Sequence, residues 1–238
     1  MARKLYVVGV GPGSPEYLTD AAKEAIRKSR YIVGYAYTLA TIEGVIDSTR
    51  QKIHKVTMNT QEAVYQDVYG RMNDGDYCTV PFTGDVSFSE SEVVDRLFQI
   101  FGEENVEIIP GISAIQVAAA RSHVPIDKAL VVTFHVTGDI EQKKTDLLQA
   151  VKKGMSVILL PRPWPRDPAK HFMQSEIAKF LRGNGVDTSR LEAWVFEHLT
   201  TDKETLFRGM VSELEGKEFS DLSVMVIDQS ESQTYLDF

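Results

Sequence analysis

Short apolar runs alternate with helix-like stretches along the first half of the chain. In the longer stretches the apolar side chains recur every three or four residues, which is typical of amphipathic helices. The strands expected from the apolar runs cover residues 4–10, 31–34, 76–84 and 105–111. The helices expected from the longer stretches cover residues 14–29, 61–72, 89–102 and 112–122. This alternation predicts a mostly parallel sheet with helices on both faces.

The pattern changes after Pro125, which interrupts two regular segments. Strands are expected at 129–138 and 155–161, and helices at 140–154 and 168–185. Three strand-like runs then follow with short connections, at 191–199, 204–211 and 222–228. Short connections between strands indicate antiparallel pairing. We therefore expect two α/β domains, residues 1–123 with a mostly parallel sheet and residues 124–238 with a mixed sheet.

Composition narrows the classes of function. The formal net charge of −8 disfavours a general nucleic-acid binder, which needs a basic face. No apolar run approaches the roughly 20 residues that span a bilayer, and no N-terminal signal sequence is visible, so we expect a cytoplasmic protein without a membrane partner. The single cysteine, Cys78, lies in a strand-like run and is expected to be a buried, inert thiol. The histidines lack H-x-x-x-H and H-E-x-x-H spacings, so we expect no protein-bound metal.

The first strand ends in the sequence GVGPG, which raises the possibility of a phosphate-binding turn. The glycines are Gly9, Gly11 and Gly13, whereas a dinucleotide fingerprint has its third glycine one residue later. Pro12 also removes a backbone N–H that a phosphate would need. The turn therefore favours a close approach of backbone to a bulky ligand over a phosphate nest, with a plain tight connection as the alternative.

Two further glycine loops follow later strands. Gly84 and Asp85 end one strand, and Gly111 precedes Ser113 and Ala114 at the start of a helix of small residues. Taken alone, Asp85 is better explained as the cap of a turn, and the small residues after Gly111 could simply allow close packing. Because carboxyl ends of parallel strands meet at one edge, three such loops together predict a ligand site there.

These three loops resemble those of the tetrapyrrole methylases, and the resemblance extends over essentially the whole chain. The quoted features are Pro-Gly after the first strand, the Gly-Asp loop, the PGISA segment, and the second-half segments VVTFHVTG, SVILLPRPWPRDPAKH and AWVFEHLTTDKETLFRG. The chain differs from the family where Gly84-Asp85-Val86 replaces Gly-Asp-Pro and where His135 is not followed by Gly-Arg. The length is most similar to the branch that methylates C(5) of cobalt-precorrin-7 in cobalamin synthesis.

The resemblance implies a homodimeric, S-adenosylmethionine-dependent C-methyltransferase whose cofactor lies in a cleft between two α/β domains. By motif position it implies the following cofactor contacts: Val10, Gly84, Asp85, Ser113, Ala114, Leu160, Pro161, Phe196 and Glu197. The sequence has no convincing catalytic triad, which suits an in-line methyl transfer in which the protein mainly positions the reactants.

A precorrin carries many carboxylates, so we expect cationic side chains near it. Arg162 and Arg166, held apart by prolines, are the main candidates, with Arg121 and Pro12 as further substrate contacts. Two solvated loop arginines are an equally simple explanation. A group that accepts the ring proton is expected to be Asp85 or His135, although a lone histidine at a strand end is more often structural.

Other functions remain open from the sequence. The alternatives are methylation at another tetrapyrrole position, diphthine-type methylation of a protein, a non-catalytic tetrapyrrole-binding module, and a nucleotide-binding α/β protein.

Overall fold

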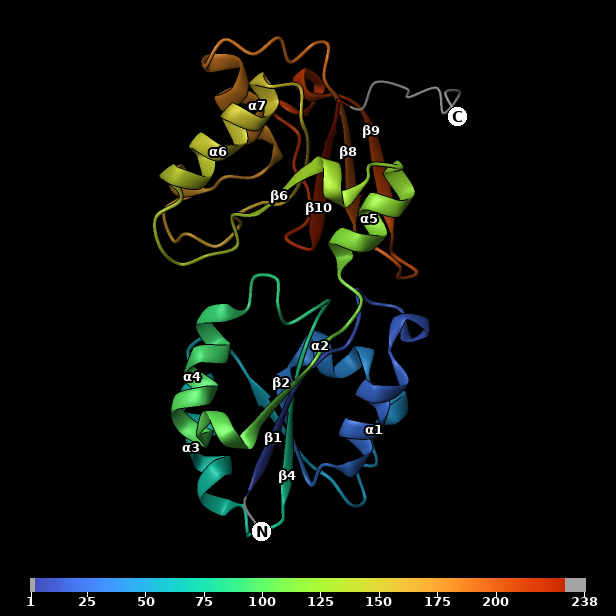
Figure 1. Cartoon of the computed structure of the whole chain (residues 1–238), viewed down its shortest axis with the longest axis vertical. Helices are drawn as coiled ribbons and strands as arrows, with labels where there is room; N and C mark the ends of the chain where they lie inside the picture. Colours follow the sequence, from blue (N-terminus) through green and yellow to red (C-terminus); the bar gives the residue numbers. More distant parts are fainter. Residues whose placement is uncertain (1–2, 230–238) are drawn as a thin grey trace. The chain divides into compact units, whose positions relative to one another are not determined.

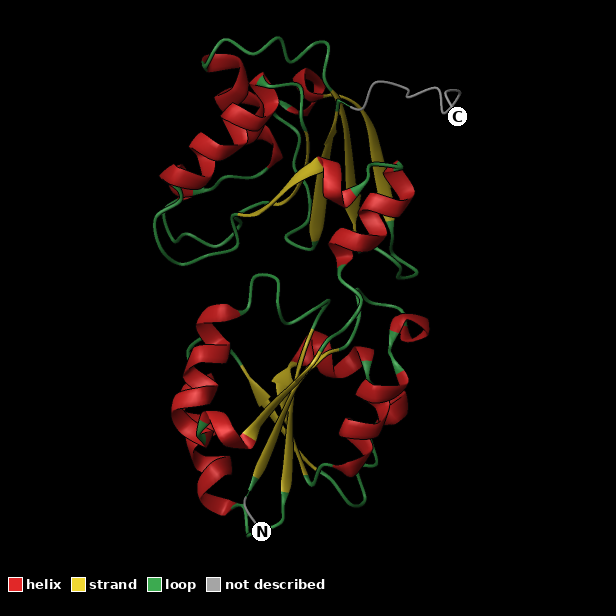
Figure 2. Cartoon of the chain, in the orientation of Figure 1, coloured by secondary structure: helices red, strands yellow, loops and turns green. Residues whose placement is uncertain are grey.

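A computed structural model describes residues 3–229 of the chain. Backbone contacts divide it into two compact units, Met1–Ala114 and Ile115–Phe238. Each unit contains one five-stranded sheet with helices packed against it (Figures 1 and 2). The expected boundary at residues 123/124 lies at the other end of helix α5 and stays a prediction.

The first unit is built on a sheet in the order β3-β2-β4-β1-β5. All four neighbouring pairs are parallel, which confirms the prediction for this half of the chain. Its strands are β1 (Lys4–Gly9), β2 (Tyr31–Tyr35), β3 (Lys52–Val56), β4 (Tyr77–Phe82) and β5 (Val106–Ile109). Its helices are α1 (Asp20–Lys28), α2 (Ala36–Thr41), α3 (Gln61–Arg71) and α4 (Ser91–Phe101), joined by the short turns η1 (Pro15–Tyr17), η2 (Glu43–Val45) and η3 (Glu103–Asn105).

Both faces of this sheet are buried. Leu5 and Val7 of β1 pack with α3 and α4, whereas Tyr6 and Val8 pack with α1. Figure 1 shows α1 on the opposite side of the sheet from α3 and α4. Successive strand residues point to opposite faces, so a strand covered on both sides has to be apolar throughout. This explains the continuous apolar run at the start of the chain.

The local structure differs from the sequence-based expectations at several places. Helix α2 was not expected, and the helix predicted at 168–185 begins at Gln174. The predicted helix 14–29 is split, because Pro15–Tyr17 forms a 3₁₀ turn and α1 begins at Asp20, capped by the Thr19 side chain. No strand was expected between residues 35 and 60, yet β3 forms the edge of the sheet. Most of its side chains face water, so this strand has no apolar pattern to reveal it.

The second unit has a mixed sheet in the order β6-β7-β10-β8-β9. Strands β6 and β7 are parallel, and the other three pairs are antiparallel, as the short connections predicted. The strands are β6 (Ala129–Thr133), β7 (Ser156–Leu160), β8 (Glu192–Glu197), β9 (Thr205–Met210) and β10 (Ser223–Asp228). The helices are α5 (Ala114–Ser122), α6 (Glu141–Lys152) and α7 (Gln174–Gly183), with the turns η4 (Ile126–Lys128), η5 (Pro168–Lys170) and η6 (Val211–Leu214).

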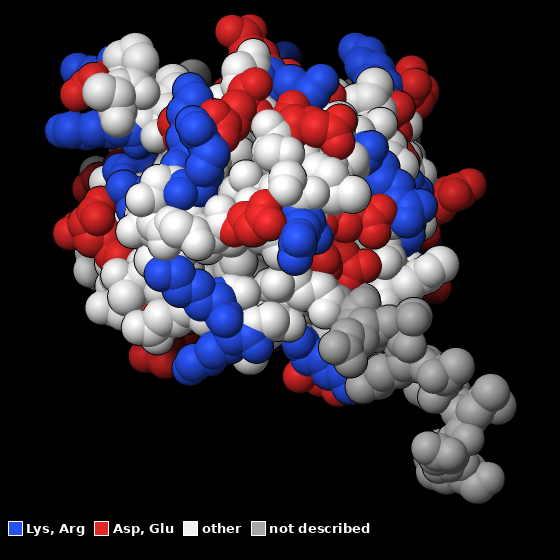
Figure 3. Space-filling model, turned by 90° about the horizontal axis from the view of Figure 1, so that it is seen from above, with Lys and Arg blue, Asp and Glu red and all other residues white. Residues whose placement is uncertain are grey.

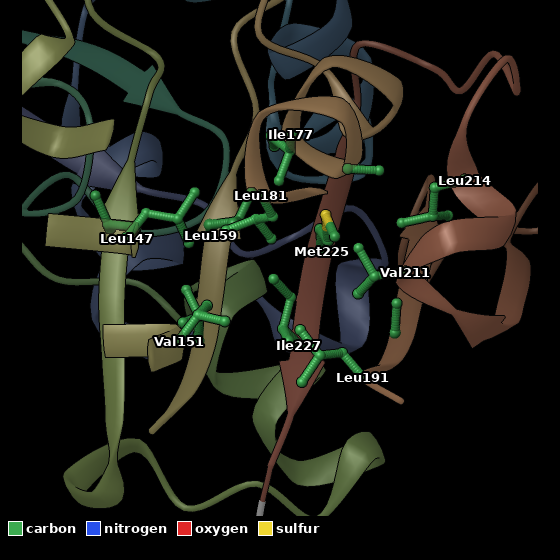
Figure 4. Close-up of a cluster of buried hydrophobic side chains, with 14 of the residues drawn as sticks. Leu147, Val151, Leu159, Ile177, Leu181, Leu191, Val211, Leu214, Met225 and Ile227 are labelled. Atoms are coloured by element: carbon green, nitrogen blue, oxygen red, sulfur yellow. The ribbon is translucent and has the colours of Figure 1, made fainter. Parts of the chain in front are cut away.

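One apolar core holds α6 and α7 against this sheet. Figure 4 shows side chains from both helices meeting Leu159 of β7 and Met225 and Ile227 of β10. Leu147 and Leu181 are fully buried in this cluster. Removing a buried leucine side chain from such a site costs about 2–5 kcal/mol. The cluster therefore fixes the strands whose ends carry the candidate residues described below.

Three composition-based points can be compared with the structure. Cys78 is fully buried on β4, and burial raises the pKa of its thiol, in agreement with an inert role. No helix within residues 3–229 combines the length and apolar character needed to cross a bilayer. On the face drawn in Figure 3, Lys and Arg side chains are interspersed with Asp and Glu side chains rather than gathered in one basic stripe.

Candidate functional site

The three glycine loops of the first unit meet at one edge of its sheet. Strands β4, β1 and β5 are neighbours and parallel, so their carboxyl ends lie together. Gly11 and Gly84 exchange two backbone hydrogen bonds, in which the Gly11 N–H donates at 3.2 Å and the Gly84 N–H at 2.7 Å. The convergence expected from the sequence is present.

Glycine is required at this edge because backbone packs directly against backbone. A Cβ placed on Gly111 would lie 2.4 Å from the Gly84 carbonyl oxygen. A Cβ placed on Gly9 would lie 2.6 Å from the Gly111 nitrogen. Gly11 and Gly84 also have φ values of +83° and +77°, a region that residues with a side chain rarely adopt. Side chains are therefore excluded, and the loops present backbone groups at this edge.

Asp85 links two of these loops. Its Oδ2 accepts a hydrogen bond from the Gly111 N–H at 2.8 Å, and its Oδ1 accepts one from the Ser87 N–H at 2.9 Å. Both carboxylate oxygens are therefore engaged by backbone. This arrangement gives Asp85 a positioning role, because it fixes the loop after β4 against the loop after β5.

The first loop does not form a phosphate nest. The Val10 N–H donates to the Phe82 carbonyl, and the Gly11 N–H donates to the Gly84 carbonyl. Pro12 has no N–H, and both Val10 and Pro12 are buried. Two N–H groups of the turn are thus engaged by the neighbouring strand and loop and Pro12 offers none, which agrees with the sequence-based argument.

Three of the expected cofactor contacts lie side by side. The position of a Cβ on Gly84 would be 3.8 Å from the Ala114 nitrogen and 3.9 Å from the Ser113 Cα. Ser113 and Ala114 are half-buried at the start of α5. Gly84, Ser113 and Ala114 are thus neighbours at the edge of the first sheet.

The expected contacts of the second unit also share one sheet edge. Strands β6, β7 and β8 run in the same direction, with β10 antiparallel between β7 and β8. Leu160 and Pro161 end β7, and Phe196 and Glu197 end β8. The Glu197 carboxylate accepts hydrogen bonds from the Thr205 hydroxyl at 2.7 Å and the Ser220 N–H at 2.6 Å. Its carboxylate therefore holds neighbouring loops in place.

His135 follows β6 at the same edge. The neighbouring Phe134 N–H donates to the Leu160 carbonyl, which places the two strand ends together. The His135 ring lies 4.0 Å, centroid to centroid, from the ring of Trp164. Its Nε2 is buried and has no hydrogen-bond partner within residues 3–229. Burial lowers the pKa of His135 to about 4, so this imidazole is neutral at pH 7.

The three candidate arginines differ in how much of their charge is already used. Arg121 forms an ion pair with Glu204. One Nη of Arg162 donates to the Thr137 carbonyl at 3.1 Å. Arg166 is exposed and makes no hydrogen bond or ion pair within the described part of the chain. Arg166 is therefore the most available of the three for an anionic ligand.

Two residues of interest escaped the sequence analysis. Trp164 lies between two prolines with 46% of its surface exposed. Its place beside arginines in a chain of net negative charge was a signal of ligand binding that the sequence analysis could have used. Glu90 precedes α4, and burial raises its pKa to about 7. Nothing in the local sequence indicates that burial, because it depends on residues from β2 and α3. Within residues 3–229 no group of three His, Cys, Asp or Glu side chains is arranged to hold a metal ion.

Comparisons with known proteins assign the family. The chain is 28% identical over 228 residues to a protein of Methanocaldococcus jannaschii named "Probable cobalt-precorrin-7 C(5)-methyltransferase", and the match covers 95% of this chain and 99% of that one. The structure of the methyltransferase CobJ superposes with a TM-score of 0.73 at 17% identity, covering 95% of this chain and 94% of that one. Uroporphyrin-III C-methyl transferase from Thermus thermophilus, solved with S-adenyl homocysteine, gives 0.67 at 17% identity, covering 94% and 91%.

The sequence pattern that defines a protein family reaches across both units. The pattern described as Tetrapyrrole (Corrin/Porphyrin) Methylases matches residues 4–215, from the first strand to the last turn before β10. It thus includes every residue that forms the two sheet edges described above except Ser220. The chain belongs to the tetrapyrrole methylase family.

Proposed function

We propose that this chain transfers a methyl group from S-adenosylmethionine to C(5) of cobalt-precorrin-7, a step in cobalamin biosynthesis. That it is a methyltransferase follows from its family. The observation that carries the finer proposal is the end-to-end similarity to the M. jannaschii relative of that name, over 95% of this chain and 99% of that one. A match of this extent covers the candidate residues of both units, and is not limited to one domain that the two proteins share.

The residues at these edges fit the cofactor. Gly84, Ser113 and Ala114 carry no bulky side chain, so a nucleoside and an amino-acid group can approach the backbone of these residues. Further contacts are proposed for Val10, Asp85, Leu160, Pro161, Phe196 and Glu197. S-adenosylmethionine supplies the activated methyl group when bound. The chain's own contribution is to hold both reactants in line and to keep water from the reacting atoms.

Most of the residues proposed to bind the substrate or accept its proton lie in the second unit. Arg162 and Arg166 are proposed to hold peripheral carboxylates of the macrocycle, with Arg121 and Pro12 in secondary roles. His135 is the better of the two candidate proton acceptors, because it is neutral at pH 7 and its Nε2 has no hydrogen-bond partner among residues 3–229. Both oxygens of Asp85 are engaged by backbone N–H groups. From the family resemblance we also propose a homodimer that functions in the cytoplasm.

The first experiment is a calorimetric titration of the purified protein with S-adenosylhomocysteine, with NAD as the control. We expect about one site per chain for S-adenosylhomocysteine and no binding of NAD. If the folded protein does not bind S-adenosylhomocysteine, the proposed methyl transfer is refuted. The alternative of a non-catalytic tetrapyrrole-binding module would then remain.

The second experiment assigns the substrate. The protein is incubated with ¹³C-methyl S-adenosylmethionine and cobalt-precorrin-7, cobalt-precorrin-4 or a protein carrying a modified histidine. We expect transfer to cobalt-precorrin-7, with the label at C(5) by carbon NMR. Transfer to either of the other substrates instead would support the corresponding alternative and contradict the C(5) proposal.

A further inference from the structure

The loop between β7 and α7 is closed at its base and crossed by side-chain hydrogen bonds. The N–H groups of Arg162 and Phe172 donate to each other's carbonyls at 3.0 and 3.1 Å, which joins the two ends of the loop. Inside it, the His171 Nε2 donates to the Pro165 carbonyl at 3.1 Å. The Arg162 side chain ties the loop to the segment after β6 through Thr137. These hydrogen bonds restrict the loop's conformation, and a restricted loop loses less entropy when a ligand binds.

Trp164 lies on this loop with one side supported and part of its surface in water. The His135 ring supports the indole at a centroid distance of 4.0 Å, and Pro163 and Pro165 restrict the backbone on both sides. Despite this support the residue remains 46% exposed. A large aromatic side chain that is fixed in place and yet half open to water offers an apolar surface to a flat ligand.

The loop that carries Trp164 also carries two exposed cationic side chains. Arg166 and Lys170 lie on the same loop, are exposed, and make no side-chain hydrogen bond or ion pair within residues 3–229. The one acidic residue of the loop, Asp167, accepts a hydrogen bond from the Ala169 N–H. In a chain with a net charge of −8, this loop is locally basic. Such a field favours a ligand that carries several carboxylates.

From the supported indole and from two exposed cations on the same loop that have no side-chain partner within residues 3–229, we propose that Trp164 is the stacking surface for one face of the conjugated macrocycle, with Arg166 and Lys170 binding its peripheral carboxylates. The His135 ring also supports the indole from one side. This inference rests on the proposed function, because it names how the same second-unit edge recognises a tetrapyrrole. An aromatic ring gives affinity for the ring face, and the cations give preference for carboxylated macrocycles.

The test uses uroporphyrin III, a stable, flat tetrapyrrole with eight carboxylates, and follows its main absorption band during titration. Trp164→Leu is expected to weaken binding roughly tenfold and to remove the band shift caused by stacking. Trp164→Phe keeps an aromatic ring and is expected to retain most of both. The double variant Arg166→Gln/Lys170→Gln is expected to weaken binding and to reduce its dependence on salt. Arg190→Gln, which removes an exposed charge from the same unit, is the matched control and should bind as the unaltered protein does.

Each variant is also titrated with S-adenosylhomocysteine and melted thermally, so that folding and cofactor binding are measured separately. Unchanged uroporphyrin binding by Trp164→Leu, or no uroporphyrin binding by a protein that binds S-adenosylhomocysteine, would overturn the stacking proposal and leave the proposed function standing. If the unaltered protein does not bind S-adenosylhomocysteine, the proposed function itself is refuted. Equal losses in Trp164→Leu and Trp164→Phe would also refute stacking, because a ring face would then not matter.

Discussion

Replacing Glu90 by glutamine is expected to stabilise the protein above neutral pH. Glu90 precedes α4 and is half-buried, with the phenols of Tyr35 on β2 and Tyr65 on α3 in its electrostatic neighbourhood. Its carboxyl has no hydrogen bond or ion pair within residues 3–229, and Arg96 on α4 lies 3.6 Å from Glu62 instead. Burial raises the pKa of Glu90 from its ordinary 4.5 to about 7. The start of a helix favours a carboxylate by only about 0.3–1 kcal/mol, so desolvation prevails.

The pKa shift sets the size and direction of the effect. A rise from 4.5 to about 7, at 1.36 kcal/mol per pKa unit, corresponds to about 3 kcal/mol at most, and partial contact with water reduces this to about 2 kcal/mol. Because the pKa of Glu90 is raised in the folded state, its contribution to the unfolding free energy is fully present below pH 4.5 and is lost as the pH rises towards 7. Glutamine resembles the protonated carboxyl and titrates at no pH. Glu90→Gln should therefore match the unaltered protein near pH 4.5 and exceed its unfolding free energy by about 2 kcal/mol at pH 8.

Urea unfolding at intervals between pH 4.5 and 8.5 measures this difference. Glu107→Gln is the matched control, since Glu107 lies exposed on β5 of the same unit, and it should give no pH-dependent gain. An unchanged unfolding free energy for Glu90→Gln at pH 8, or a gain of the same size at every pH, would refute the assignment of a buried, destabilising carboxylate.

Three further perturbations test the two sheet edges. The unaltered protein should lose up to about 3 kcal/mol of unfolding free energy as the pH falls from 6.5 to 4, because the lowered pKa of His135 lets the unfolded state bind a proton more readily than the folded state. His135→Gln should not show this loss. Equal losses for both proteins in urea unfolding would contradict the assignment. Gly111→Ala should lower the free energy of unfolding by several kcal/mol, because its Cβ would lie 2.4 Å from a backbone oxygen. Gly44→Ala, which has open space at its Cβ, should lower it little. Equal melting temperatures of the two variants would contradict this prediction. Asp85→Asn should lower the free energy of unfolding by about 1–3 kcal/mol, because the side-chain NH₂ group would face a backbone N–H. It should also weaken S-adenosylhomocysteine binding in calorimetry. Unaltered affinity would contradict the positioning role of Asp85 for the two loops.

Much of the architecture was predictable because it depends on local pattern. The first strand is apolar at every position because helices cover both faces of its sheet. The short connections after residue 191 predicted antiparallel pairing, and β8, β9 and β10 pair in that way. The glycine loops could be predicted to meet, since parallel strands bring their carboxyl ends to one edge.

The edge strand β3 was not predictable, because its exposed side chains follow no apolar period. The position of β10 between β7 and β8 was equally hidden, since the order of strands in a sheet depends on how distant segments pack.

The sequence by itself determined the fold class, the family and the three loops that carry the candidate site. Only the tertiary structure decided the chemical state of the residues in them. Asp85 has both oxygens engaged because Gly111, a residue from another loop, donates to one of them. Glu90 and His135 have opposite pKa shifts because packing removes water from both, and desolvation disfavours the charged form of an acid and of a base alike. Hydrogen bonding and desolvation depend on neighbours that are distant along the chain, and a linear pattern does not specify them.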